Sequence, residues 1–329
     1  MNRRDAILTF LALGASGTPF TAVAQSPRRI GAIHTRGGAL SPGQWVATGF
    51  AAAMKELGYQ EGRDYVYDFR GWQRSEEIPA LVRELIAGKA ELIIAASPPS
   101  IAGAKSVTDR VPIVMMFSAN PIAIGLARSL SRPGGNVTGL TWDHGFETYA
   151  KQLELFKETL PRIRRVALMW DTTPDSTHDI YVKYYEQAAP RLGLALIPVG
   201  LGEVANIGPA FEKMRNEKAE ALIILPSAQI TVPHREAIMA LVARDRVPAL
   251  SGIIRPLFEG ALYHSAPNFS DNPRRVAAFV DRIFKGAKPG DLPIEQPTKY
   301  DFIVDQRVAR KLGIAVPQSI LVRADRVIE

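Results

Sequence analysis

The sequence contains no cysteine in its 329 residues. This absence excludes disulfide bonds, thiolate zinc sites, iron–sulfur clusters held by thiolates and cysteine nucleophiles. The sequence also has no run of basic residues. The Lys and Arg residues (40) exceed the Asp and Glu residues (33) by only +7, and this excess is spread along the chain. Such a mild excess does not favour a nucleic-acid partner.

The usual sequence motifs of enzymes are absent as well. There is no Gly-x-Gly-x-x-Gly, no Walker loop and no Gly-x-Ser-x-Gly elbow, and the 5 histidines lack metal-ligand spacing. We therefore expect no enzyme activity, no cofactor and no metal site. A hydrolase that draws Ser, His and Asp from scattered strand ends stays open as an alternative.

The first residues have the pattern of an export signal. Arg3-Arg4 precedes an apolar stretch from Ala6 to Gly17, and Ala22-Val23-Ala24 has the small-x-small form of a cleavage site. The stretch is too short for a transmembrane helix. We predict a signal peptide over 1–24, cleavage after Ala24 and a periplasmic protein; the general and twin-arginine export routes both stay open.

The rest of the chain repeats itself. With 47% apolar and 22% charged residues it is globular, and its length suits one large or two medium domains. Four landmarks recur in the same order. The pairs are Arg28-Arg29 with Arg164-Arg165, Leu57-Gly58 with Leu192-Gly193, Lys89-Ala90-Glu91 with Lys218-Ala219-Glu220, and Asp109-Arg110-Val111-Pro112 with Asp245-Arg246-Val247-Pro248.

Apolar runs and helical stripes alternate along both halves. Phe50, Ala53, Met54 and Leu57, for example, share one helix face. We predict an α/β fold of two Rossmann-like lobes with parallel sheets. The expected strands are Ile30–His34, Tyr65–Phe69, Leu92–Ala96, Ile113–Phe117, Val166–Trp170, Leu194–Val199, Ala221–Leu225 and Ala249–Ser251.

Ligands of open α/β sheets bind beyond the carboxyl ends of the strands, so the residues there are the candidate site. Ser97 and Asn120 precede Pro98 and Pro121, and we expect each to cap a helix whose free N–H groups suit a carboxylate. Plain helix capping is an equally good interpretation. The other candidates are His34, Thr35, Ser100, Trp142, Asp171, Ser227, His264 and Ser265.

Two of these candidates have a specific expected role. Asp171 could pair with an ammonium group of the ligand or accept from its hydroxyls, unless it is an ordinary loop acid. Trp142, like Trp170, could stack on a flat ligand, although burial in a core is at least as good an explanation.

Several longer stretches resemble a known family. They are Glu56–Arg63 (ELGYQEGR), Ser131–Leu140 (SRPGGNVTGL), Phe284–Lys299 (FKGAKPGDLPIEQPTK) and Leu312–Leu321 (LGIAVPQSIL) with Ala324–Ile328 (ADRVI). The chain is similar, nearly end to end, to the periplasmic substrate-binding proteins of ABC transporters with the type I fold. The nearest group includes binders of tryptophan and tyrosine.

The resemblance implies two lobes joined by a three-segment hinge. It places lobe one at 28–141 plus 249–290 and lobe two at 142–248 plus 291–329. The crossings are expected near Thr141–His144, Pro248–Gly252 and Gly290–Pro293.

At three presumed pocket positions this chain departs from the family. Asn120 stands where the family usually has Asp, Asp171 where it has Asn, and Ser265 near a usual Tyr.

The resemblance also implies a mechanism and partners. A small ligand, carboxylate-bearing and like an amino acid or aromatic acid, closes the cleft, and the closed monomer delivers it to an ABC permease with its ATPase subunit. A sensor that signals to a receptor is an alternative. A repressor of the same fold would need an N-terminal helix-turn-helix, and this chain has an export pattern there.

Overall fold

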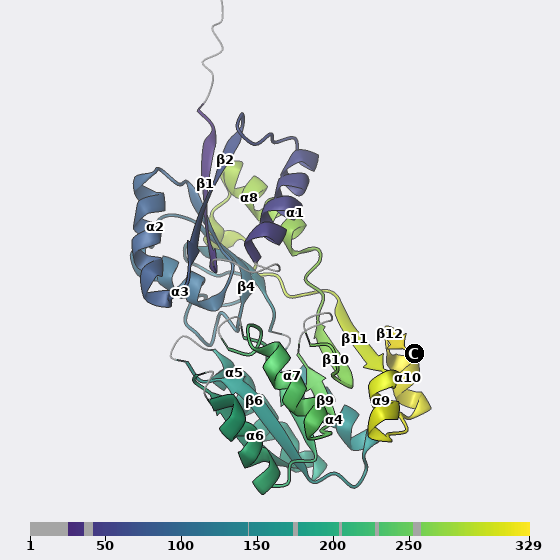
Figure 1. Ribbon diagram of the computed structural model, residues 1–329. Helices are drawn as coiled ribbons and strands as arrows, with labels where there is room; N and C mark the ends of the chain where they lie inside the picture. The colour runs from purple at the N-terminus through teal and green to yellow at the C-terminus, as the bar shows by residue number, and fades with distance from the viewer. Residues whose placement is uncertain are drawn as a thin grey trace, which may run out of the picture.

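A computed structural model describes residues 26–35, 42–143, 145–173, 177–203, 206–227, 230–252 and 258–329. The predicted export segment, 1–24, lies outside the described residues. Two α/β lobes stand one above the other, and the chain passes between them more than once (Figure 1). In the described part of the chain, no helix combines the length and apolar character needed to cross a bilayer.

The first lobe is a five-stranded parallel sheet in the order β2-β1-β3-β4-β5. Helices α1 and α8 cover one face, and α2 and α3 cover the other. The strands are β1 (Arg28–Thr35), β2 (Tyr65–Trp72), β3 (Leu92–Ala95), β4 (Ile113–Ser118) and β5 (Val137–Thr141). The helices are α1 (Pro42–Glu56), α2 (Ile78–Ala87), α3 (Pro98–Val107) and α8 (Asn272–Phe284).

The second lobe is a seven-stranded sheet in the order β12-β11-β10-β9-β8-β6-β7. Only β11 runs antiparallel to its neighbour β10 among the pairs of this sheet. The strands are β6 (Arg165–Asp171), β7 (Ala195–Leu201), β8 (Ala221–Ile224), β9 (Ala249–Ser251), β10 (Tyr263–Pro267), β11 (Tyr300–Asp305) and β12 (Arg326–Ile328). The helices are α4 (Phe146–Thr159), α5 (His178–Ala188), α6 (Ile207–Asn216), α7 (Arg235–Arg244), α9 (Gln306–Leu312) and α10 (Gln318–Arg323).

The two sheets share one topology. The order β7-β6-β8-β9-β10 repeats β2-β1-β3-β4-β5, so the internal repeat read from the sequence corresponds to a repeated architecture. The turns before β3 and β8 match in detail, because Lys89 (φ 65°) and Lys218 (φ 56°) both adopt the left-handed conformation. One expected helix position differs: Leu57 follows the end of α1 and is 42% exposed.

Two of the three crossings between the lobes lie at other places than the sequence suggested. β9 and β10 pair within the second sheet, so the prediction that 249–267 belongs to lobe one is wrong. The second crossing follows β10, near 268–271, and not Pro248–Gly252. The third follows Glu295, because Ile294 is still buried in the core of the first lobe, so it lies beyond the predicted Gly290–Pro293.

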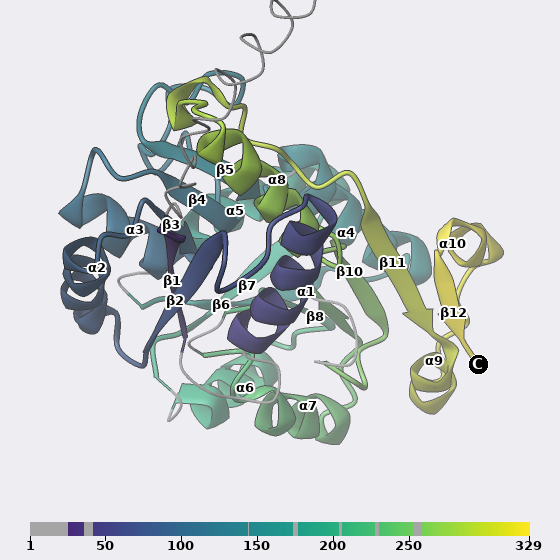
Figure 2. The ribbon, with the colours of Figure 1, turned by 90° about the horizontal axis from the view of Figure 1, so that it is seen from above.

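The crossings exchange one helix between the lobes. After β5 the chain enters the second lobe, where α4 packs on α5; after β10 it returns to the first lobe, where α8 packs on α1. Figure 2 shows α8 beside α1, although α8 directly follows β10 of the second lobe in the sequence. The exchange follows the repeat, since β5 and β10 are equivalent strands.

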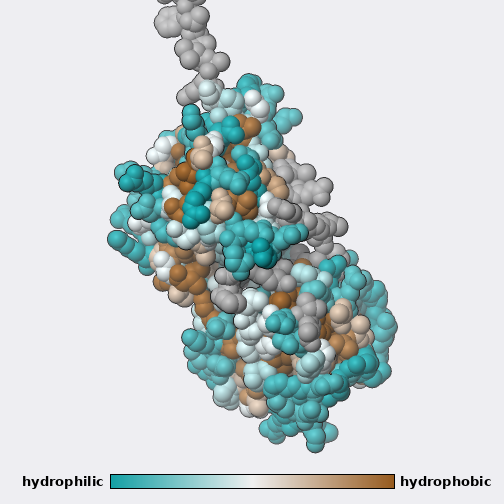
Figure 3. Space-filling view, turned by 60° about the vertical axis from the view of Figure 1, so that its left-hand side comes forward, coloured by the Kyte–Doolittle hydropathy of each residue, from teal (hydrophilic) through white to brown (hydrophobic). Residues whose placement is uncertain are grey.

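The carboxyl ends of both parallel sheets point toward the gap between the lobes. In Figure 1, β1 runs from the far end of the upper lobe toward the lower lobe, and β11 of the lower lobe, antiparallel to β10, runs away from the upper lobe. In the space-filling view the molecule narrows between the lobes, with hydrophobic residues at the narrowing (Figure 3). Strand ends of both lobes therefore border one region, which is where ligands of such sheets bind.

Candidate functional site

Asp171 and Ser227 meet at the carboxyl edge of the second sheet. Asp171 ends β6 and is 1% exposed, and Ser227 follows β8. The Ser227 hydroxyl donates to Asp171 Oδ2 at 2.6 Å, and the backbone N–H of Thr173 donates to Asp171 Oδ1 at 2.7 Å. The carboxylate is thus turned into its own lobe, where it organises two neighbouring strand ends. This arrangement differs from the expected role of Asp171 as a partner for a ligand ammonium group.

His178 completes this network and was not a candidate from the sequence. Its Nδ1 accepts the backbone N–H of Asp171 at 3.1 Å, and its Nε2 lies 3.1 Å from the carbonyl oxygen of Pro226. The two contacts define one neutral tautomer, with the proton on Nε2. Burial is the main cause that lowers the pKa of His178 to about 4, although the charge of Asp171 opposes the change. His178 is therefore a neutral bridge between the ends of β6 and β8 at ordinary pH.

In the first lobe, Ser97 and Ser100 lie together at the start of α3. Ser97 caps the helix by accepting the backbone N–H of Ser100, as predicted from Ser-Pro. The two hydroxyls are 2.9 Å apart, and the indole Nε1–H of Trp72 donates to Ser100 Oγ at 2.9 Å. Ser100 is fully buried in the first turn of α3, whereas Ser97, the capping residue before the helix, is 9% exposed.

His34 and Thr35 end β1. His34 is 3% exposed and its ring stacks on Phe69, with ring centroids 3.9 Å apart. The backbone of Thr35 is part of the strand, and its side chain is outside the described atoms. The buried imidazole is thus packed against β2 of its own lobe, at the end of β1.

Asn120 caps a set of turns, which corrects the expected helix start at Pro121. Its Oδ1 accepts the backbone N–H groups of Ile122 and Ala123 at 3.1 and 3.0 Å. Residues 121–126 form turns rather than a helix, so no helix dipole adds to these N–H groups. The neighbouring Ala119 packs with the core of the second lobe, which places this segment between the lobes.

Trp142 lies at the first crossing and contacts both lobes. Its backbone N–H donates to the carbonyl of Ser118 at 2.9 Å, and its Nε1–H donates to the Tyr181 hydroxyl of α5 at 2.6 Å. Tyr181 stacks on Tyr149, with centroids 5.1 Å apart. Burial raises the pKa of Tyr181 well above its usual value, while Trp142 and the backbone N–H of Asn120 oppose the rise.

Asp143, the next residue, is a charged group that the sequence analysis missed. It is 6% exposed, and its Oδ1 accepts the backbone N–H of Gly145 at 2.9 Å. Its negative charge contributes to the raised pKa values of Tyr149 and Tyr181. The signal that could have identified it is its place directly after Trp142, at a predicted crossing.

His264 and Ser265 were expected at a strand end, but they lie inside β10 and their side chains are buried. His264 is fully buried and Ser265 is 6% exposed. Gln152 of α4 donates to the carbonyl of Ser265 at 3.2 Å, and so does the hydroxyl of Tyr300. Tyr185 donates to Gln152 Oε1, so the cluster is closed within the second lobe.

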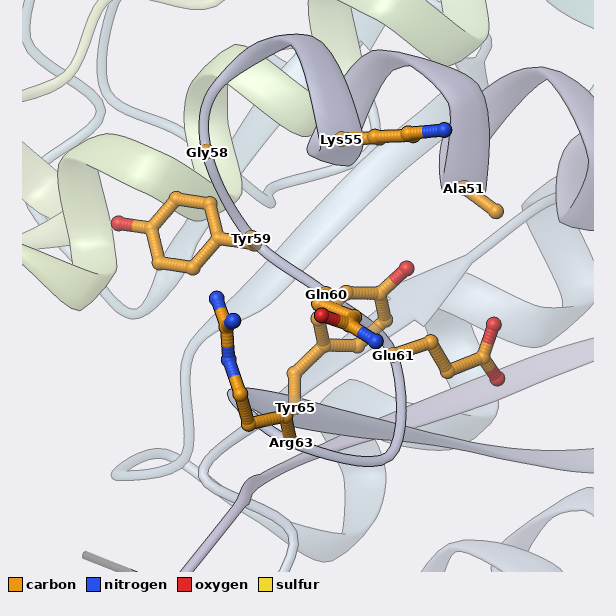
Figure 4. Close-up of a pocket in the computed structure, with 8 residues that line it drawn as sticks. All are labelled: Ala51, Lys55, Gly58, Tyr59, Gln60, Glu61, Arg63 and Tyr65. Carbon is orange, nitrogen blue, oxygen red and sulfur yellow. The ribbon is translucent and has the colours of Figure 1, made fainter.

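Two hollows of the structure are lined by other residues. One, of about 600 Å³, is at the amino edge of the first sheet, between the end of α1 and the start of β2. Figure 4 shows Tyr59 and Arg63 on one side of it and Lys55 and Glu61 on the other. The Tyr59 hydroxyl donates to Asp281 at 2.9 Å. Another, of about 360 Å³, is lined by Trp170 and by mostly apolar residues of α5, of the turn that follows it and of β7.

Comparison with known proteins identifies the family. Residues 44–328 match the sequence model described as "ABC transporter substrate binding protein". A tyrosine-binding protein of Clostridioides difficile is 22% identical over 267 residues, which are 81% of this chain and 76% of that protein.

Solved structures show the same fold. An ABC domain in complex with L-Trp from Streptococcus pneumonia superposes with a TM-score of 0.81 at 22% identity, covering 92% of this chain and 100% of that one. The ligand-free, open structure of a substrate-binding protein with adhesive properties from Clostridium difficile gives a TM-score of 0.67 at 21% identity, covering 92% and 99%.

These similarities confirm the predicted resemblance to the tryptophan and tyrosine group and the type I fold of two α/β lobes. Members of the family are binding proteins rather than enzymes, as expected for this chain, and they act outside the cytoplasm. The family match spans most of the sequence, from the first helix to the last strand. The chain therefore belongs to the ABC transporter substrate-binding proteins.

Proposed function

We propose that the protein binds an aromatic amino acid between its lobes and delivers it to an ABC permease. The similar proteins that bind tyrosine and L-Trp support an aromatic ligand. The observation that carries the proposal is the position of Trp142, whose indole lies on the crossing between the lobes beside Tyr181 and Tyr149. An aromatic ligand placed there gains offset or edge contacts worth about 0.5–1.5 kcal/mol beyond burial.

The polar ends of the ligand would meet the two lobes separately. Its carboxylate would face the start of α3 at Ser97, where the first N–H groups of the helix carry partial positive charge. Its ammonium group would face Asp143, a carboxylate directly beside Trp142. We assign this role to Asp143 in place of Asp171, whose oxygens already accept hydrogen bonds within the second lobe.

Binding to both lobes would favour the closed arrangement, because a ligand that contacts both gains affinity only when they approach. Closure would pivot at the three crossings, and the closed monomer would be the form that the permease recognises. We further propose that the protein reaches the periplasm after cleavage at Ala24, so that the exported chain begins at Gln25. The mass of the protein purified from the periplasm tests the cleavage site.

Isothermal titration calorimetry with L-Trp, L-Tyr, L-Phe, benzoate and L-Leu tests the ligand class. We expect the aromatic amino acids to bind more tightly than L-Leu, and Trp142→Ala to lower their affinity by roughly threefold to tenfold. Asp143→Asn should weaken amino acids by about tenfold or more and leave benzoate unchanged. Tight binding of L-Leu alone, or no effect of either variant, contradicts the assignment.

Small-angle scattering of the same samples tests hinge closure. We expect the radius of gyration to fall when the ligand saturates the protein. A ligand that binds without changing the radius of gyration would rule out closure while leaving the ligand class intact.

A further inference from the structure

The far end of the second lobe, away from the interlobe region, carries a row of basic side chains. They lie at or just before the amino ends of β6, β8 and β9 and in the last turn of α9, all at one edge of the sheet. Five of the six are exposed and Arg165 is half-buried. We call this set the basic pole; its members are Arg164, Arg165, Lys218, Arg246, Arg310 and Lys311.

Hydrogen bonds show that these residues are neighbours. Arg165 donates through Nε to the carbonyl of Lys218 at 2.9 Å, and Arg246 donates to the carbonyl of Lys311 at 2.8 Å. β8 and β9 are adjacent strands, so the turns that precede them, which hold Lys218 and Arg246, lie side by side. The basic pole is thus a row across four neighbouring elements rather than a set converging on one point.

The acids nearby do not neutralise this row. Among the described residues, no ion pair involves a member of the basic pole. Glu217 pairs with Lys213, and Asp245 pairs with Arg215 and Arg244. Glu220 lies at the same edge and accepts the backbone N–H groups of Arg164 and Arg165, both at 2.8 Å, so it offsets part of the charge. Several positive charges remain exposed to solvent.

The internal repeat supplies a comparison within the same chain. The equivalents of Arg164 and Arg165 in the first lobe are Arg28 and Arg29, and both are paired. Arg28 contacts Glu91 at 2.7 Å, and Arg29 contacts Asp68 at 3.6 Å. The same landmark residues are therefore neutralised at the end of one lobe and left unpaired at the end of the other, so the charge is a property of the second lobe and not of the fold.

We propose that the basic pole is a contact surface for an anionic phospholipid bilayer. A row of separated charges suits a diffuse anionic surface, whereas a single small anion needs converging donors. The proposed function brings the protein to a permease in a membrane, so its surface would meet lipid there. Attraction of Lys and Arg to anionic lipid acts within about a Debye length, roughly 8–10 Å, and weakens with salt. Contact would hold the protein near the membrane and reduce its search for the permease to two dimensions; this does not depend on which ligand binds.

Co-sedimentation with vesicles tests the proposal. The purified protein is mixed with vesicles of phosphatidylcholine alone or with one third phosphatidylglycerol, in low salt and in about 0.5 M salt. We expect binding only to the anionic vesicles in low salt. The triple variant Arg164→Glu, Lys218→Glu, Lys311→Glu should reduce the partition coefficient by about tenfold or more. The matched control Lys89→Glu, Arg110→Glu, Lys288→Glu makes the same charge change on exposed residues of the first lobe and should retain most of the binding.

Each other outcome overturns the proposal. Absence of binding to anionic vesicles, or equal losses for the two triple variants, excludes a specific basic pole. Release from the vesicles by millimolar inorganic phosphate at constant ionic strength indicates a phosphate site instead. Tighter binding of duplex DNA than of vesicles indicates a nucleic-acid surface.

Circular dichroism spectra that match the wild-type protein establish that the variants are folded.

Discussion

His178 makes the second lobe sensitive to acid, and the size of the effect follows from its burial. Because burial lowers its pKa from the usual 6.5 to about 4, the unfolded chain takes up a proton at a pH at which the folded chain does not. The stability that this difference represents is fully present above pH 6.5 and is lost as the pH falls toward 4. A shift of this size corresponds to about 3 kcal/mol in total, of which about 2 kcal/mol is lost between pH 7.5 and pH 5.

Urea unfolding of the wild-type protein and of His178→Asn, at pH 7.5 and pH 5, measures this effect. The asparagine keeps an acceptor for the backbone N–H of Asp171 but cannot take up a proton. At pH 7.5 we expect the variant to be less stable by about 1 kcal/mol, because the hydrogen bond to Pro226 is lost. Between pH 7.5 and pH 5 the wild-type protein should lose about 2 kcal/mol more than the variant.

Equal losses for the two proteins would refute the reasoning, since they would show that other groups carry the acid sensitivity. A functional consequence follows as well. Protonation of His178 would break the contact with the backbone N–H of Asp171 and loosen the ends of β6 and β8. Ligand affinity of the wild-type protein should therefore fall with its stability as the pH is lowered.

Two further predictions concern single groups. Gly139→Ala in β5 should lower the free energy of unfolding by more than about 3 kcal/mol in urea denaturation, because its φ is +122° and a Cβ atom would lie 2.3 Å from the carbonyl oxygen of Met115. Gly135→Ala, where nothing lies within 4 Å, is the control and should change stability by less than about 0.5 kcal/mol; a similar loss for both would contradict the steric argument. Tyr181→Phe removes the acceptor of the Trp142 indole N–H and should destabilise the protein by about 1 kcal/mol in thermal unfolding, and an unchanged melting temperature would show that this contact is not needed.

Much of the fold was readable from the sequence because its causes are local. The runs that became β3, β4, β6 and β8 are nearly all apolar, as expected for strands buried on both faces, and strands of this kind recur in the same order in both halves. Two other strands are different in kind: β5 was not predicted, and β10 was anticipated only as a strand end at His264 and Ser265. β5 and β10 have five residues each and include Thr, Gly, His, Ser and Pro. Their strand conformation depends on the neighbour with which they pair.

The lobe boundaries depend on the same two strands. The repeat makes β10 the equivalent of β5, so the chain crosses after both, whereas the family resemblance implied a second crossing that was too early, at Pro248–Gly252. Likewise, the sequence located the strand ends where polar residues gather but not the direction in which those residues point. Asp171 accepts hydrogen bonds from inside its lobe because Ser227 and Thr173 lie beside it only after β6 and β8 pair.

The sequence by itself determined the α/β class, the twofold repeat, the family likeness and the strand ends that border the interlobe region, because each depends on residues close together in the chain. The tertiary structure alone decided which strands close each sheet, where the chain crosses, and that Asp143 and His178 belong beside the predicted residues. It also decided that the positive charge is paired at the end of one lobe and exposed at the end of the other. These properties depend on contacts between residues far apart in the sequence, which periodicity and composition do not record.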